Sequence, residues 1–562
     1  MSNSNSENRV TLNRREALLL AAAGGIGAAL TRPAFASDST KTTAHQEPGP
    51  CSTPKTAVAN TQSGKVRGFV SGDVYTFKGV PYGQNTGGEN RWLPAKPLVP
   101  WKGEYPALIY GANCPQYLHD NSGLAQAFLQ DWDDGYLSED MLKLNIWTPS
   151  LTGKRAVMVY FHGGGMLSGS SYELPAQEGA QLARHHDIVS VTVNHRLNIL
   201  GFFDVSEVGG SAYEDSANLG MTDLVAALQW VHDNISNFGG DPDKVMIYGQ
   251  SGGGGKVCCL MGMPSAKGLF HRAAAQSGGG GGRMPTPEQT KEFTRLVVKE
   301  LGIAPNDIAA LQKIDWFALD AAANAATAKM HTPRMTLPFF PMPDFVTRHG
   351  WGPTLDGRII TISAFGDSAP EISKDVPMMI GSVSEEGCAY ASNPTEQEFL
   401  ASLVKALGDA KGNALLAAMK KAHPEKSIRT LSYGVGGLFF RNNVITMAKK
   451  KYDLHAAPIY QYLFSWQTPM LEGPGAWHTS DLQFCFDNTL RCAQGTGNTP
   501  EAQALAKKMA TAWANFARTG NPSQPGLVWE PSDPVRNQTM VWNNECRMVD
   551  DPDGEVRKIF QS

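Results

Sequence analysis

A five-residue glycine pattern, Gly249-Gln250-Ser251-Gly252-Gly253, constrains the fold of this chain more than any other feature. It follows a β-prone run at 245–248 and precedes a segment that can turn helical. A serine between a strand and a helix sits on a sharp, strained turn, so its neighbours need almost no side chain. The pattern therefore predicts a strand, a tight turn and a helix, with Ser251 in the position of a nucleophile.

A second glycine pattern, His162-Gly163-Gly164-Gly165, follows another apolar run at 157–161. Bare glycine lets several backbone N–H groups point at one spot, and a developing alkoxide needs such fixed donors. Either pattern alone is compatible with an ordinary turn. The two together, in this order along the chain, indicate a nucleophilic serine with an oxyanion-binding loop.

A nucleophilic serine needs a base, and the base needs an acid that orients it. His478 lies in a loop between a strand-like run at 459–464 and a late helix, from which a histidine can reach the turn of a neighbouring strand. Glu385 and Glu386 follow another strand-like run at 377–381. Spacing alone does not separate these two carboxylates, and a solvated pair is the alternative interpretation for both.

Several further motifs resemble those of the type-B carboxylesterases, the family that includes the cholinesterases. The resemblance runs from about Val58 to the C-terminus. It is carried by Gly79-Val80-Pro81-Tyr82, Ser138-Glu139-Asp140-Met141-Leu142-Lys143-Leu144-Asn145, Asn194-His195-Arg196-Leu197 with Gly201-Phe202, and Asn234-Ile235 with Phe238-Gly239-Gly240-Asp241-Pro242.

This resemblance implies roles for particular residues. The family's acid is usually the glutamate directly before a glycine, here Glu386, and its histidine is His478, which gives a Ser251–Glu386–His478 triad. Backbone N–H groups of Gly164, Gly165 and Gly252 would form the oxyanion hole. The chain departs from the family at Gln250, where a glutamate is common, and at Met141, which replaces a signature cysteine and leaves Cys114 without that partner.

Strand-like and helix-like runs alternate, which predicts an α/β protein with a large, mostly parallel twisted sheet. We expect an α/β-hydrolase fold with helices on both faces and long insertions. A strand is expected at 188–193, a helix at 224–231, and a late helix on the spacing of Leu505, Met509, Trp513 and Phe516. No linker or repeat divides the 562 residues, so a single domain is expected at 56–562.

The N-terminal segment 1–36 has the features of a twin-arginine signal peptide. Arg14 and Arg15 precede an apolar run at 18–30, and Ala34-Phe35-Ala36 offers a small-x-small cleavage site. That run is shorter than the ~20 residues that span a bilayer, which argues against an anchor. We expect a bacterial protein exported to the periplasm or secreted, with a disordered lead-in at 37–55.

Composition excludes several classes of function. The net charge is −4 and no basic stripe with interleaved aromatics is present, so nucleic-acid binding is unsupported. The run Gly252–Lys256 fails as a phosphate-binding loop, because Gln250 and Val257 occupy positions that need glycine and Ser or Thr. We expect no cofactor and no metal. Among the 8 cysteines, Cys485 and Cys492 are candidates for a disulfide.

These observations predict a serine carboxylic-ester hydrolase that works through an acyl-enzyme on a small or medium ester. Met166, Gln250 and Trp477 are candidates for the substrate pocket because they adjoin the reacting residues in sequence. An amidase or lactonase with the same triad is the nearer alternative. A non-catalytic binding module of the same fold is the other, although such modules lack the serine or its partners. The neutral Gln250 favours neutral over cationic esters.

Overall fold

The computed structural model describes residues 49–117, 129–279, 284–330, 352–387, 393–471 and 473–562. By its internal contacts the chain divides into a segment, Met1–Glu47, and a compact unit, Pro48–Ser562. The expected signal peptide at 1–36 lies outside the described residues. Of the expected lead-in at 37–55, the described part includes Cys51, whose backbone pairs with that of Val70 in both directions at 2.8 Å.

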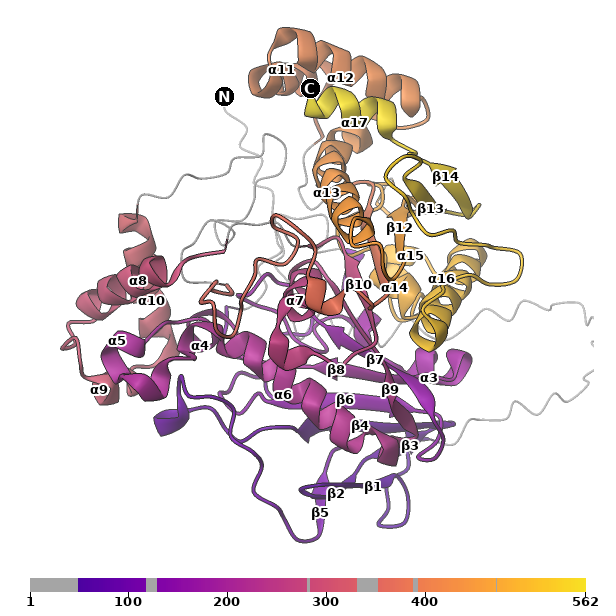
Figure 1. The fold of residues 1–562 in the computed structure, drawn as a ribbon. Helices are drawn as coiled ribbons and strands as arrows, with labels where there is room; N and C mark the ends of the chain where they lie inside the picture. The colour runs from indigo at the N-terminus through magenta and orange to yellow at the C-terminus, as the bar shows by residue number, and fades with distance from the viewer. Residues whose placement is uncertain (1–48, 118–128, 280–283, 331–351, 388–392, 472) are drawn as a thin grey trace, which may run out of the picture. The chain divides into compact units, whose positions relative to one another are not determined.

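One large mixed sheet organises the compact unit (Figure 1). Its strand order, within the described part of the chain, is β14-β13-β12-β11-β10-β9-β7-β8-β6-β4-β3. Along this order, each strand from β13 to β8 is parallel to the next one. The pair β14–β13 at one end and the pairs β8–β6, β6–β4 and β4–β3 at the other are antiparallel. The sheet comprises β3 (Phe69–Ser71), β4 (Val74–Pro81), β6 (Lys143–Thr148), β7 (Arg155–Phe161), β8 (Val189–Val193), β9 (Gly240–Gln250), β10 (Arg272–Gln276), β11 (Met378–Val383), β12 (Ile459–Phe464), β13 (Gln538–Trp542) and β14 (Arg547–Asp550).

A small second sheet of β1 (Val58–Thr61), β2 (Gly64–Arg67) and β5 (Glu104–Pro106) lies near the N-terminal end of the described chain. The central strands of the large sheet read as continuous apolar runs because both of their faces are covered. In β7, Val157 and Val159 contribute to one hydrophobic core, whereas Met158 and Tyr160 contribute to the other. The side-chain period of two sends successive residues to opposite faces.

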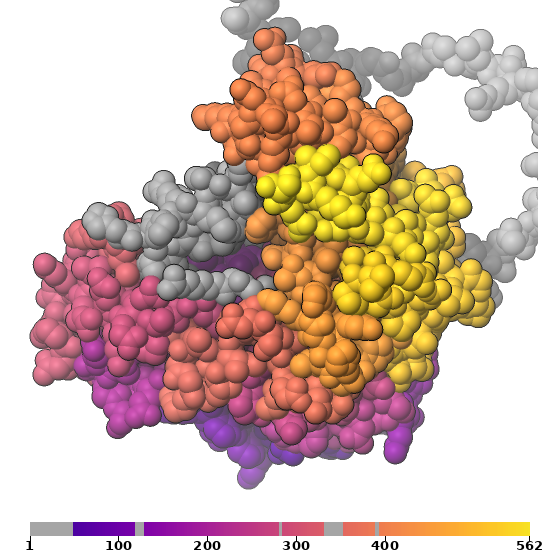
Figure 2. All heavy atoms as spheres, turned by 45° about the horizontal axis from the view of Figure 1, so that its top comes forward, coloured from indigo at the N-terminus to yellow at the C-terminus, as the bar shows by residue number. Residues whose placement is uncertain are grey.

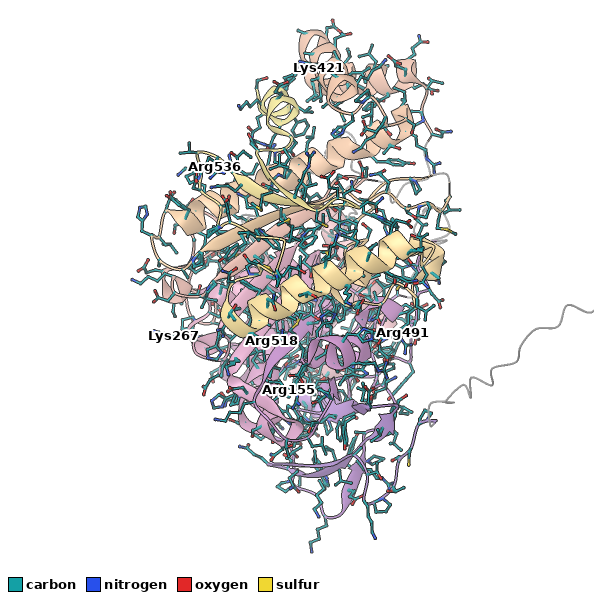
Figure 3. The ribbon with its side chains drawn as sticks, turned by 90° about the vertical axis from the view of Figure 1, so that its right-hand side faces the viewer. Arg155, Lys267, Lys421, Arg491, Arg518 and Arg536 are labelled. Carbon is teal, nitrogen blue, oxygen red and sulfur yellow. The ribbon has the colours of Figure 1, made fainter. Side chains whose placement is uncertain are left out.

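Helices cover both faces of the sheet, as expected. One face is packed by α6 and α7, and the other by α3, α14 and α16, with α16 lying across that side of the molecule (Figure 3). The helices are α3 (Ala180–His186), α4 (Asn198–Gly201), α5 (Ser206–Gly209), α6 (Leu219–Asn234), α7 (Gly252–Gly262), α8 (Pro287–Glu300), α9 (Ile308–Gln312), α10 (Trp316–Lys329), α11 (Glu396–Leu407), α12 (Asp409–Ala422), α13 (Ile428–Tyr452), α14 (Leu482–Cys485), α15 (Ala493–Thr496), α16 (Pro500–Thr519) and α17 (Gly554–Gln561).

The late helix shows how local sequence sets these boundaries. Thr499 caps α16 by accepting a hydrogen bond from the N–H of Ala502, and Pro500 occupies the first helical position, where no N–H is needed. Gly520 ends the helix with φ +78°, a left-handed conformation that costs glycine little. The predicted apolar stripe of this helix is buried in one core.

Insertions form a smaller cluster beside the sheet. Helices α11, α12 and α13 share a separate hydrophobic core to which the C-terminal helix α17 adds Val556. In Figure 2, α17 lies against the surface of this group. Within the described ranges, no helix is long and apolar enough to cross a membrane.

Candidate active site

The serine turn lies at the end of the central strand β9. Ser251 has φ +57° and ψ −123° and immediately precedes α7. A non-glycine residue in this region is strained. A Cβ on Gly253 would lie 2.0 Å from the carbonyl oxygen of Phe161, and one on Gly249 would lie 2.5 Å from the carbonyl carbon of Gly253. Glycine at both positions is therefore a steric requirement of the turn.

The neighbouring strand β10 fixes the backbone of this turn. The N–H of Ser251 donates to the carbonyl oxygen of Gln276 at 2.7 Å. A Cβ on Gly278, two residues further along, would lie 1.9 Å from the carbonyl oxygen of Ser251. Sequence reasoning missed this role of Gly278, because nothing in the local pattern shows which backbone will approach it.

The glycine loop after β7 meets the serine turn. Gly164 and Gly165 have φ +76° and +64°. A Cβ on Gly252 would lie 2.6 Å from the backbone nitrogen of Gly165, and one on Gly163 would lie 3.4 Å from Cβ of Ser251. The two glycine motifs, which are about 90 residues apart in the printed sequence, are thus in backbone contact beside Ser251.

His478 and Glu386 come from loops that follow β12 and β11. Nδ1 of His478 and a carboxylate oxygen of Glu386 form a short hydrogen bond. The Glu386 side chain is fully buried, and its other oxygen accepts a hydrogen bond from the N–H of Val383 at 3.1 Å. On the other side of the ring, Nε2 of His478 lies 3.2 Å from the side-chain nitrogen of Gln250. A histidine whose Nδ1 donates to a carboxylate presents the Nε2 lone pair towards the serine turn.

Glu385 is also fully buried but points elsewhere. Its carboxylate pairs with Lys426 at 2.6 Å and accepts the N–H of Ala476 at 2.8 Å. Burial acts to raise the pKa of this carboxyl, but the nearby Lys426 ammonium and the hydrogen bonds outweigh it, so the pKa lies below its ordinary value. Neither carboxylate is solvated, because both side chains are buried and each has its own partner, Lys426 for Glu385 and His478 for Glu386.

The other predicted pocket residues lie in different surroundings. Met166 is partly buried, and its methyl group lies 3.9 Å from the position of a Cβ on Gly255, at the first turn of α7. Trp477 is fully buried and packs with Leu129 and Tyr433. Although Trp477 is next to His478 in the sequence, its indole is not exposed to solvent. It supports the loop that carries the histidine.

The described cysteines are all free thiols. Cys485 and Cys492 are buried and unpaired with each other, so the suggested disulfide between them is wrong. Burial raises the pKa of Cys492 to about 12, which keeps this thiol protonated and unreactive. Among the described residues there is also no group of three metal-ligating side chains.

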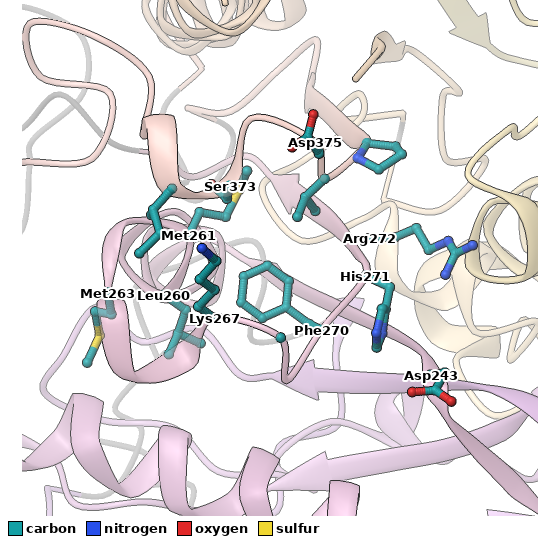
Figure 4. A pocket seen from close by; sticks show the side chains of 14 residues that line it. Asp243, Leu260, Met261, Met263, Lys267, Phe270, His271, Arg272, Ser373 and Asp375 are labelled. Atoms are coloured by element: carbon teal, nitrogen blue, oxygen red, sulfur yellow. The ribbon is translucent and has the colours of Figure 1, made fainter. Parts of the chain in front are cut away.

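A cavity of about 560 Å³ lies at the ends of the strands opposite to Ser251. Figure 4 shows the side chains that line it. It is bordered by the C-terminal half of α7, the start of β10 and the segment before β11, and none of the candidate triad lines it. Its lining residues are Asp243, Leu260, Met261, Met263, Lys267, Gly268, Phe270, His271, Arg272, Ile372, Ser373, Asp375, Val376 and Pro377.

Four loops at the carboxyl ends of parallel strands thus gather a strained serine, a glycine loop, a histidine and a carboxylate, which is the arrangement of an α/β-hydrolase. The chain belongs to the carboxylesterase family, whose model matches residues 55–556. It is 30% identical to the para-nitrobenzyl esterase of Bacillus subtilis over 509 residues, which cover 90% of this chain and 99% of that protein. It is 32% identical to the phenmedipham hydrolase of Pseudarthrobacter oxydans, over 84% of this chain and 92% of that one.

Solved structures give the same result. An esterase from Clostridium hathewayi, described as able to hydrolyse aliphatic aromatic polyesters, superposes with a TM-score of 0.77 at 33% identity, covering 90% of this chain and 97% of its own. The predicted family, the α/β-hydrolase fold and the activity of a serine ester hydrolase are therefore confirmed.

Proposed function

We propose that Ser251, His478 and Glu386 are the catalytic triad of this esterase, and that the N–H groups of Gly164, Gly165 and Gly252 bind the oxyanion. The observation that carries this proposal is the buried contact between Glu386 and Nδ1 of His478, on the ring whose Nε2 faces Gln250, the residue before Ser251. The contact between the two glycine motifs supports the oxyanion assignment.

In this mechanism Oγ of Ser251 attacks the ester carbonyl while Nε2 of His478 takes its proton. Glu386 holds Nδ1–H and stabilises the imidazolium that forms. The backbone donors stabilise the tetrahedral oxyanion, and its collapse expels the alcohol, which receives the proton from His478. Water, deprotonated by the same imidazole, then releases the acid from the acyl-enzyme.

We propose neutral esters of small or medium size as substrates. The serine turn carries the amide of Gln250 rather than a carboxylate, so no negative charge there attracts a cationic alcohol. Met166 supplies an apolar surface next to α7. A relative named para-nitrobenzyl esterase, and a similar esterase described as able to hydrolyse aliphatic aromatic polyesters, point to esters with aromatic groups.

An amidase or lactonase activity of the same triad is tested by rate comparison. We expect p-nitrophenyl butyrate to be hydrolysed far faster than butyryl p-nitroanilide or γ-butyrolactone. Faster turnover of the anilide or the lactone would overturn the preference for esters.

We propose in addition that residues 1–36 direct export through the twin-arginine route, to the periplasm or outside the cell. The paired Arg14 and Arg15, the apolar run and the Ala34-Phe35-Ala36 site support this proposal.

The nucleophile is tested with a fluorophosphonate probe and mass spectrometry. We expect the label on Ser251 alone, and we expect Ser251→Ala to abolish labelling and to lower kcat about 10⁴–10⁶-fold, because triad members act as a unit. An unchanged melting temperature of the variant shows that the loss is chemical. Labelling of a different serine would overturn the assignment.

A further inference from the structure

A fully buried lysine lies directly behind the glycine loop. Lys256 is in the second turn of α7, and its side chain has no solvent exposure. Its Nζ donates a hydrogen bond of 2.9 Å to the carbonyl oxygen of His162, the first residue of the loop motif. Burial of an ammonium group costs free energy. The mechanism above gives this lysine no part, although it lies five residues from the proposed nucleophile.

The hydrogen bond from Lys256 restrains the orientation of the peptide groups in the glycine loop. In a trans peptide unit the C=O and the N–H point in opposite directions. Fixing the oxygen of His162 therefore fixes the direction of the N–H of Gly163. The ring of His162 continues the chain of contacts, because its Nδ1 lies 3.1 Å from the oxygen of Gly163. That second contact fixes the direction of the N–H of Gly164, one of the proposed oxyanion donors.

We propose that Lys256 is a positioning residue for ester hydrolysis, which holds the peptide units of the His162–Gly164 segment so that the loop N–H groups aim at the oxyanion. The proposal rests on the proposed function, because it assumes that this loop binds the oxyanion. A charged donor binds a carbonyl oxygen more strongly than a neutral one. Its field also polarises the peptide group, which strengthens the hydrogen bonds that this group donates.

The surroundings of Lys256 determine its charge. The titratable groups that face it are Glu173, His162 at the end of β7, and His195, whose ring lies 5.1 Å from that of His162. Burial lowers the pKa of Lys256 to about 7, although Glu173 opposes the shift. Burial and the nearby Lys256 charge also hold the pKa of His195 well below its ordinary value, so that imidazole is neutral.

A pH dependence follows from this arrangement. The ammonium form of Lys256 prevails below about pH 7, and the weaker amine donor replaces it above that pH. The wild-type kcat is therefore expected to fall to a lower plateau as the pH rises through about 7. A purely structural lysine would leave the alkaline side flat.

Three variants of the full-length mature enzyme test the proposal with a neutral p-nitrophenyl ester. Lys256→Met removes the donor at nearly constant volume, and Lys256→Arg keeps a charge at every pH. Lys451→Met is the matched control, since Lys451 is also buried, donates to the oxygens of Ser373 and Lys374, and has a pKa lowered to about 8 by burial. Lys451 lies on α13, far from the loop in sequence and outside the proposed machinery.

We expect Lys256→Met to lower kcat about 10–100-fold with KM changed less than about threefold, a smaller loss than removal of a whole oxyanion donor. The alkaline fall should disappear in this variant, and Lys256→Arg should restore part of kcat without restoring the fall. Lys451→Met should keep the wild-type kcat and its pH profile. A Lys256→Met enzyme with wild-type kcat, or with its alkaline fall retained, would overturn the proposal.

A measurement on the wild-type enzyme decides the case if the variants fail to fold. A trifluoromethyl ketone adds the serine oxygen to form an anionic hemiketal and thus reports on the oxyanion site. Its affinity should weaken as the pH rises through 7, in parallel with kcat, whereas an affinity that stays constant would contradict the proposal. Failure of the proposed function is recognised separately, because Ser251→Ala would then retain activity.

Discussion

The side-chain nitrogen of Gln250 lies 3.2 Å from Nε2 of His478, so the residue before the nucleophile contacts the base directly. The amide of Gln250 carries no charge, so it does not favour the imidazolium form of the base. A carboxylate at the same place would instead stabilise the imidazolium. The electrostatics of the base thus depend on one residue at which the chain departs from the common family pattern.

We expect Gln250→Glu to move the acidic limb of the kcat/KM profile to higher pH, since that limb reports the base of the free enzyme. The ratio of choline-ester to neutral-ester turnover should rise as well, because the new charge attracts cations. The measurement is a pH series with both substrates. An unshifted limb and an unchanged ratio in a folded variant would mean that Gln250 serves only to hold the loop.

The two adjacent glutamates should respond differently to removal of their charge. Glu386→Gln is expected to lower kcat about 10³–10⁴-fold with little change in melting temperature, since the amide can no longer hold the imidazolium. Glu385→Gln should instead destabilise the fold by about 3–5 kcal/mol, because Lys426 loses the partner of a buried pair. Parallel kinetics and chemical denaturation distinguish the two outcomes, and a reversed order would exchange the roles of the two residues.

Asp481 should make the stability of the protein depend on pH. Burial raises the pKa of this carboxyl to about 6 from an ordinary value of 3.8, despite hydrogen bonds from Tyr462 and Gln276. Between these pH values the native state holds a proton that the unfolded chain releases. The carboxyl therefore contributes stability that is present below about pH 4 and lost as the pH rises through 6.

We expect Asp481→Asn, which cannot ionise, to avoid this loss. The difference in unfolding free energy between variant and wild type should grow in favour of the variant by about 3 kcal/mol from pH 4 to pH 7. Urea unfolding at several pH values measures it. The same difference at every pH would show that Asp481 is ionised in the native state throughout this range.

Export should depend on the paired arginines. We expect conversion of Arg14 and Arg15 to lysine to trap the precursor in the cytoplasm, and we expect the exported wild-type chain to begin near Ser37. Cell fractionation with N-terminal sequencing checks both points. Normal export of the double variant, or a start far from Ser37, would refute the signal-peptide proposal.

The serine turn could be predicted from sequence because its requirements are local. Gly249 and Gly253 are needed wherever a strand turns this sharply into a helix, so their spacing carries the information. The surroundings of Glu385 and the burial of Lys256 could not be predicted, because they depend on side chains distant in sequence such as Lys426 and on the carbonyl of His162. The full burial of Trp477 could not be predicted for the same reason, because it depends on the distant Leu129 and Tyr433.

The C-terminal helix has a consequence for the order of events in the cell. Val556 of α17 completes the hydrophobic core of α11–α13, and β13 and β14 complete one edge of the sheet. Translation must therefore reach β14 before that edge of the sheet is complete, and Val556 before this cluster is complete. Passage of the unfolded chain across a membrane during translation would separate α17 in time from the α11–α13 core. A pathway that exports folded proteins would let α17, β13 and β14 pack before the protein crosses.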